Sequence, residues 1–214
     1  MKFFTRVVMI SILSLLLITV EKGTYFNHGP YAETTASEMA DVLNEIPRRL
    51  RRQIVQSTFK IVTESGHGTG TYMSYDSNRF ILTAAHVVRG ASQISAEVPG
   101  QGTVELTKIY EDTNRDIAIL QTEVPINVDP IKFKRSTGFE PGERTVYAGF
   151  PSSHDVVVFT GTVAGSSVWN GDKIIMHSYA WPGASGGAVF DFRGRLIGIL
   201  VAIDISRDPI RNLD

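Results

Sequence analysis

The sequence predicts an all-β protein built from two similar antiparallel barrels, and three observations lead to this fold class. The chain has 214 residues, of which 43% are hydrophobic and 20% charged, an ordinary globular composition. From Gln53 onward, short runs rich in β-branched and aromatic residues alternate with turn residues. A connector bounded by Pro and Gly, over Ile131–Gly142, divides these runs into two sets. We therefore expect one barrel on either side of the connector.

The N-terminal residues are interpreted as an export or anchor segment. Lys2 and Arg6 lie beside an apolar stretch, Val7–Val20. This stretch is short for a membrane-spanning helix, which needs about 20 residues, and it fits the apolar core of a signal peptide. We assign residues 1–22 to a cleaved signal peptide or to an uncleaved membrane anchor. The protein is thus expected to be secreted, periplasmic or membrane-anchored facing outward.

Residues 23–52 are expected to form a linker that contains one short helix over Ser37–Asn44. Ser37 is a suitable N-cap, and Pro47 limits the extension of the helix. The basic run from Arg48 to Arg52 is interpreted as a solvated charged segment. Contact with an anionic membrane and processing at paired arginines are the alternatives. Residues 53–214 are assigned to a single β-rich domain.

Each expected strand is a short β-prone run that turn residues bound at both ends. The first set is Ser57–Glu64, Gly68–Tyr75, Arg79–Ala84, Ile94–Val98, Val104–Glu111 and Ile117–Gln121. The second set is Arg144–Gly149, Val156–Ala164, Lys173–Tyr179, Gly187–Asp191 and Arg195–Ala202.

Composition also narrows the chemistry. The chain has no cysteine, which excludes disulfides, thiolate metal sites and a cysteine nucleophile. The formal net charge of -1 provides no overall field for nucleic acid, and we expect no nucleic-acid partner. The histidines do not show the spacing of a zinc site, so we expect no metal and no cofactor.

Three short segments stand out together, although each alone has an ordinary structural explanation. They place His86, Asp116 and Ser185, in this chain order, each at the edge of an expected strand. The segments are Thr83–Val88, Asp116–Leu120 and Pro182–Val189.

Serine, histidine and aspartate together supply the nucleophile, the base and the orienting carboxylate that acyl transfer needs. A serine hydroxyl needs an adjacent base to become a nucleophile, and His86 would take the proton of Ser185 and return it to the leaving amine. Asp116 would hold the imidazole in the right tautomer. Gly183 lets the backbone turn so that its N–H and that of Ser185 form an oxyanion hole, in which each donor contributes about 3 kcal/mol of transition-state stabilisation.

These segments resemble the trypsin-like serine proteases, and most closely the cysteine-free bacterial HtrA/Deg-type branch, here without a PDZ domain. The resemblance covers roughly residues 55–204. It implies a chymotrypsin-like pair of six-stranded-type barrels and endopeptidase activity through an acyl-enzyme, with unfolded or exported polypeptides as the expected substrates. Further matching segments are Gly66–Gly70, Val146–Pro151, Gly161–Gly165 and Leu196–Ile199.

One departure from the family pattern concerns the last strand of the second barrel, which is expected beyond Asp204 and is missing or shortened. In the family this strand helps to wall the specificity pocket. The alternative function is therefore a catalytically weak pseudoprotease or binding module on the same fold. The sequence carries no prediction of oligomeric state.

By resemblance, the substrate pocket should be lined by residues just before Ser185 and by residues of the last expected strand. The pocket residues so assigned are Tyr179, Ala180, Leu200, Val201 and Ala202. No acidic residue lies among them, and an apolar lining favours small or medium aliphatic P1 side chains. His177, eight residues before Ser185, offers an alternative preference for acidic P1 residues.

Overall fold

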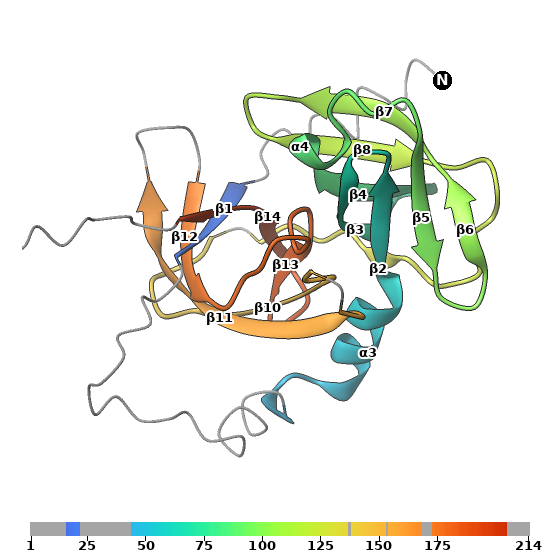
Figure 1. Ribbon diagram of the computed structural model, residues 1–214. Helices are drawn as coiled ribbons and strands as arrows, with labels where there is room; N and C mark the ends of the chain where they lie inside the picture. Colours follow the sequence, from blue (N-terminus) through green and yellow to red (C-terminus); the bar gives the residue numbers. More distant parts are fainter. Residues whose placement is uncertain (1–15, 22–43, 137, 153, 168–172, 205–214) are drawn as a thin grey trace, which may run out of the picture.

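Two curled β-sheets dominate the computed structural model of this protein (Figure 1). The structure describes residues 16–21, 44–136, 138–152, 154–167 and 173–204. The expected helix over Ser37–Asn44 lies outside these residues except for Asn44. The all-β fold class with two barrel-like sheets is confirmed.

The first barrel has the strand order β6-β5-β2-β3-β4-β8-β7, with β9 beside β3. Its two edge strands are consecutive in the chain and are separated by Leu106, whose N–H donates to the carbonyl of Ile94 at 2.9 Å. The sheet therefore curls until its edges meet. The strand bounds are β2 Thr58–Thr63, β3 Gly66–Tyr75, β4 Asn78–Ala84, β5 Ile94–Val98, β6 Gly102–Glu105, β7 Thr107–Asp112, β8 Ile117–Gln121 and β9 Ile131–Lys132.

One expected strand of this barrel differs from the structure. The run Val104–Glu111 was predicted as a single strand, but it forms parts of β6 and β7, which pair with different neighbours. The chain changes partner at Leu106, whose side chain is buried in the barrel core. A run of β-prone residues does not reveal such a corner because both sides of it favour strand.

The second barrel is closed, in the order β1-β12-β11-β10-β13-β14. The pairs β12–β11, β11–β10, β10–β13 and β13–β14 are antiparallel. Strand β1 lies between β12 and β14 and runs parallel to both. The bounds are β1 Leu16–Glu21, β10 Arg144–Gly149, β11 Val157–Ser167, β12 Lys173–Ser178, β13 Ala188–Asp191 and β14 Leu196–Asp204.

Strand β1 comes from the N-terminal segment that the sequence predicts to be an export or anchor segment. It pairs Ile18 with Ile174 of β12 and with Leu200 of β14. The second barrel thus has a sixth strand, but this strand comes from the N-terminal part of the sequence, whereas the expected one follows Asp204. Among the described residues, no helix has the length and apolar character needed to cross a membrane.

Helix α3, Arg48–Ser57, was not predicted. The basic run was expected to be part of a linker, but it forms the first turns of this helix. Pro47 precedes the helix, and its carbonyl accepts the N–H of Arg51 at 3.0 Å. Ile54 and Ser57 are buried. An apolar side chain at the inner face therefore holds the helix against the barrels, while its charged face stays in water.

Three apolar clusters stabilise this arrangement. One fills the first barrel and another the second. The third lies between the barrels and joins Phe80 and Leu82 of β4 to Val146 of β10 and Phe190 of β13, with Ile54 of α3. Burying each such side chain contributes about 1.5–3 kcal/mol. The packing between the barrels is what fixes residues from the two halves relative to one another.

Candidate active site

His86 lies on α4, Ala85–Val88, a single helical turn that follows β4 directly. Ala85 and Val88 are buried, so this turn is anchored from below while the His86 side chain stays 38% exposed. The N–H of Ala85 donates to the carbonyl of Asp116 at 3.0 Å. The start of the helix is therefore tied to the residue that partners His86.

Asp116 lies immediately before β8 and contacts His86 twice. The Nδ1–H of the imidazole donates to Oδ2 at 2.6 Å, and the backbone N–H of His86 donates to Oδ1 at 2.7 Å. A carboxylate only accepts, so Nδ1 carries the proton and Nε2 of the neutral ring is left as an acceptor. This is the tautomer that a general base needs.

Arg89 extends this dyad at the surface, and sequence reasoning did not find it. Its Nη2 lies 3.8 Å from Oδ1 of Asp116 and its Nε lies 3.7 Å from Oε1 of Glu111. The Arg89 side chain is 52% exposed, so each of these ion pairs contributes little to stability. Its position directly after the short helix that carries His86 would have been the signal.

Ser185 lies in the tight turn that leads into β13, and two flanking glycines have positive φ. Gly183 has φ +97° and Gly186 has φ +92°. A Cβ on Gly186 would lie 2.1 Å from the carbonyl oxygen of Thr69, so no other residue fits there. The Gly-rich run is needed because the turn presses against β3 of the first barrel.

Strand β3 joins the two halves of the site. The N–H of Thr69 donates to the carbonyl of Ser185 at 2.8 Å. A Cβ on Gly68 would meet the side chain of Val87 on one side and the carbonyl oxygen of Ser185 on the other. Because Val87 follows His86 in α4, the absence of a side chain at Gly68 lets the helix and the serine turn approach one another.

The backbone N–H groups around Ser185 fall into two sets. Those of Ala184, Gly186 and Gly187 donate to the carbonyls of Trp181, Leu200 and Ala184. Those of Gly183 and Ser185 donate to no group of the described residues. Buried or partly buried N–H groups are almost always paired, so two unpaired donors in one turn are available to a ligand. These are the two donors that the sequence assigns to an oxyanion hole.

The residues assigned to the substrate pocket occupy two environments. Ala180 and Leu200 lie in the core of the second barrel, Val201 is buried in the cluster between the barrels, and Tyr179 is 57% exposed. The side chain of Ala202 lies outside the described residues. Which of these residues contact a substrate remains a prediction.

Tyr147, another residue that the sequence did not single out, supports this region. Its hydroxyl donates to the carbonyl of Tyr179, and its ring stacks on Phe159 with the centroids 4.9 Å apart. Burial raises the pKa of Tyr147 well above its ordinary value. The phenol therefore stays protonated and holds the segment before Ser185 at any working pH.

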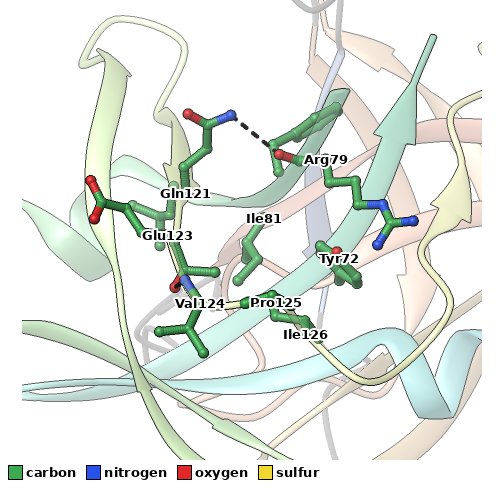
Figure 2. Close-up of a pocket in the computed structure, with 11 residues that line it drawn as sticks. Tyr72, Arg79, Ile81, Gln121, Glu123, Val124, Pro125 and Ile126 are labelled. Atoms are coloured by element: carbon green, nitrogen blue, oxygen red, sulfur yellow. Dashed lines mark hydrogen bonds between the residues drawn. The ribbon is translucent and has the colours of Figure 1, made fainter. Parts of the chain in front are cut away.

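A pocket of about 250 Å³ lies elsewhere, on the first barrel (Figure 2). Tyr72, Ile81 and the segment from Gln121 to Ile126 line it, and the Gln121 side chain donates to the carbonyl of Arg79 at 3.3 Å. None of the predicted site residues lines this pocket.

Comparison with known proteins places the chain in a family. Residues 68–199 match the model of the trypsin-like peptidase domain. Among solved structures, an HtrA-type protease, AlgW with a tripeptide, has a TM-score of 0.61 at 24% identity and covers 70% of this chain and 52% of its own. The Rv3671c protease of M. tuberculosis H37Rv, in an inactive form, has a TM-score of 0.62 at 21% identity. The match covers 76% of this chain and 85% of the Rv3671c chain.

The similar curated proteins are proteases of the Do or HtrA kind. Protease Do-like 1, chloroplastic, of Arabidopsis thaliana is 32% identical over 66% of this chain and 35% of its own length. The periplasmic serine endoprotease DegP of Escherichia coli K12 is 30% identical over 64% of this chain and 30% of its own. The chain thus spans about a third of the length of these relatives. The matched residues contain the dyad and the serine turn, and the chain belongs to the trypsin-like peptidase family.

Proposed function

We propose that this protein is a serine endopeptidase in which Ser185, His86 and Asp116 act as a catalytic triad. The Ser185 Oγ attacks the scissile carbonyl carbon while Nε2 of His86 accepts its proton. The C–N bond of the tetrahedral intermediate then breaks, and His86 gives the proton to the leaving amine. Water, deprotonated by the same Nε2, hydrolyses the resulting acyl-enzyme and restores Ser185.

The observation that carries this proposal is that an oriented histidine occurs together with two backbone N–H groups at the serine turn that bind no described acceptor. Asp116 accepts the Nδ1–H of the His86 ring at 2.6 Å and the backbone N–H of His86 at 2.7 Å, which leaves Nε2 free to act as a base. The N–H groups of Gly183 and Ser185 are the donors for the developing oxyanion. A protein that only binds peptides has no physical need for both features.

The substrate we propose is an extended polypeptide, unfolded or exported. The Escherichia coli relative DegP is a periplasmic serine endoprotease, and the AlgW structure is a structure with a tripeptide. An extended peptide suits a site formed between two barrels. We extend both points to this chain and place its activity outside the cytoplasm, with Leu16–Glu21 retained as β1 of the second barrel.

A fluorophosphonate probe tests the proposal directly, because it labels serines that a neighbouring base activates. We expect the full chain to be labelled and the Ser185→Ala variant to remain unlabelled at equal concentration and fold. We also expect the full chain to hydrolyse fluorescently labelled, reduced casein, and the variant not to do so.

An unlabelled full chain with an intact near-UV circular dichroism spectrum would contradict the proposal and favour a pseudoprotease. If casein is cut, sequencing the products gives the P1 preference. Aliphatic P1 residues are expected, whereas a predominance of glutamate would indicate His177, which is exposed on β12.

A further inference from the structure

We infer that Thr69 and His67 are positioning residues that hold the oxyanion hole in its binding conformation. This inference rests on the proposed function. Both residues lie on β3 of the first barrel, two positions apart, so their side chains point to the same face of the strand. That face looks toward the serine turn of the second barrel, because the hydroxyl of Thr69 donates to the carbonyl of Gly183 and Nε2 of His67 lies against the same glycine.

The direction of the Gly183 N–H depends on the carbonyl of Pro182, since both belong to one trans peptide plane and point opposite ways. The carbonyl of Pro182 accepts the N–H of Ser152 at 2.7 Å. This bond turns the Gly183 N–H away from Ser152, on the side where it meets no described acceptor. If the bond with Ser152 is lost, the peptide plane is free to rotate and the hole loses one of its two donors.

Ser152 holds this carbonyl from an unfavourable backbone conformation. Its φ is +52°, a left-handed value that costs a non-glycine residue about 1–2 kcal/mol. Such a conformation persists only where neighbouring contacts enforce it. The N–H of His154 closes this turn on the carbonyl of Pro151 at 3.0 Å, and the preceding residues connect Ser152 to β10.

Phe150, two residues before Ser152, is fixed at both of its backbone polar groups by β3. Its N–H donates to the hydroxyl of Thr69 at 3.0 Å, and its carbonyl accepts from Nε2 of His67 at 3.2 Å. The two side chains thus hold the segment that carries Ser152. They form a clamp from the first barrel onto a loop of the second.

Thr69 also binds the hole itself. Its hydroxyl donates to the carbonyl of Gly183 at 2.7 Å while it accepts from Phe150. One buried hydroxyl therefore joins the loop of Ser152 to the glycine that supplies the oxyanion donor. His67 lies against the same glycine, since a Cβ on Gly183 would come within 2.6 Å of Nε2.

Thr71 provides a matched control on the same strand and the same face. It is as deeply buried as Thr69, and its hydroxyl accepts the N–H of Ala188 at 3.1 Å. Among the described residues, its hydroxyl makes no hydrogen bond to the loop of Ser152 or to Gly183. Thr71→Val removes the partner of one backbone group, the N–H of Ala188, whereas Thr69→Val removes the partner of two, the N–H of Phe150 and the carbonyl of Gly183. Only Thr69→Val should disturb the hole.

The test compares Thr69→Val, Thr69→Ser and Thr71→Val in the full chain. We expect Thr69→Val to lower the rate of fluorophosphonate labelling and the kcat for casein by about 10- to 100-fold, with KM little changed. This is at most the lower end of the loss of about 100- to 1,000-fold for removing one oxyanion donor outright, because the donor is misplaced and not deleted. Thr69→Ser retains the hydroxyl and should recover most of the rate. Thr71→Val should react at close to the parent rate, even if its melting temperature falls as far.

Equal labelling rates for Thr69→Val and Thr71→Val would overturn the inference, as would a Thr69→Ser variant as slow as Thr69→Val. If Thr69→Val does not fold, His67→Ala against His67→Gln gives the same comparison, because the glutamine amide can still donate to Phe150. Failure of the proposed function is a separate result, since the parent chain itself would then remain unlabelled.

Discussion

Asp116 combines a chemical role with an unusual backbone conformation. Its φ is +51°, in the left-handed region, where aspartate and asparagine are better tolerated than other side chains. This conformation lets one residue bind His86 through both carboxylate oxygens and also accept the N–H of Ala85. Aspartate thus suits position 116 because it tolerates the left-handed backbone conformation and because its carboxylate accepts both hydrogen bonds from His86.

The variant Asp116→Asn separates these two properties. Asparagine tolerates the same φ and has the same shape, but its amide cannot enforce the tautomer in which Nε2 is the acceptor. We expect the melting temperature to change little and kcat to fall by roughly 10⁴-fold. The measurement is casein hydrolysis beside thermal unfolding.

The control is Asp76→Asn, at an exposed turn residue with the same φ of +51° and no part in the site. It should keep full activity. An Asp116→Asn variant that also keeps full activity would show that Asp116 does not orient the base.

At this scale, much of the candidate site was readable from the sequence. Asp116 and His86 contact one another as the resemblance implies, because their chemistry requires fixed residue types. Thr69 and His67 were not found, although they lie in a Gly-rich motif that the resemblance included. Their importance comes from contacts with a loop more than 80 positions away, which no local pattern reveals.

At the scale of single elements, β11 shows how closely two strands can approach when a side chain is absent. Gly161 pairs with Ser178 of β12, and a Cβ there would lie 2.6 Å from the carbonyl oxygen of His177. Gly165 lies on the same strand, and a Cβ there would meet nothing within 4 Å.

These two glycines make a matched pair of substitutions. We expect Gly161→Ala to lower the free energy of unfolding by about 1–3 kcal/mol, because the backbone of β12 must move. Gly165→Ala should be neutral or stabilising by about 0.4–1 kcal/mol, because alanine restricts the unfolded chain. Urea unfolding measures both. Equal effects at the two positions would contradict the account of β11.

Most strand positions followed from the sequence because β-prone runs and turn residues alternate regularly. Helix α3 was missed because its five-residue basic run conceals the periodic apolar positions, of which Ile54 is fully buried. The corner at Leu106 was missed because both flanking runs favour strand. In each case tertiary packing decided what local preference left open.

At the scale of the whole molecule, the barrels divide the chemistry between them. His86 and Asp116 come from the first barrel, whereas Ser185 and Gly183 come from the second. The apolar cluster between them, together with the contacts of β3, therefore determines the alignment of the site. A substitution in this cluster is expected to change activity through geometry as well as stability.

Closure of the second barrel by β1 leads to a prediction about backbone protection. The variant Thr19→Pro removes one N–H from β1 and distorts its pairing with β12 and β14. We expect faster hydrogen exchange at the amides of β12 and β14 than in the parent. Thr19→Val, which retains the N–H and favours strand, should exchange like the parent. Equal protection in the proline variant would show that β1 does not close the barrel in solution.

The position of β1 also has a consequence for the order of folding. Its residues are synthesised before every strand of the first barrel, while the strands that flank it, Lys173–Ser178 and Leu196–Asp204, are synthesised after all of them. Pairing of such distant segments is slow because a long loop must close before any contact forms. Until then both flanking strands have an open edge, which is a template for aggregation. A translating chain can therefore complete its first barrel before β12 is made, but its second barrel only after β14 has been made.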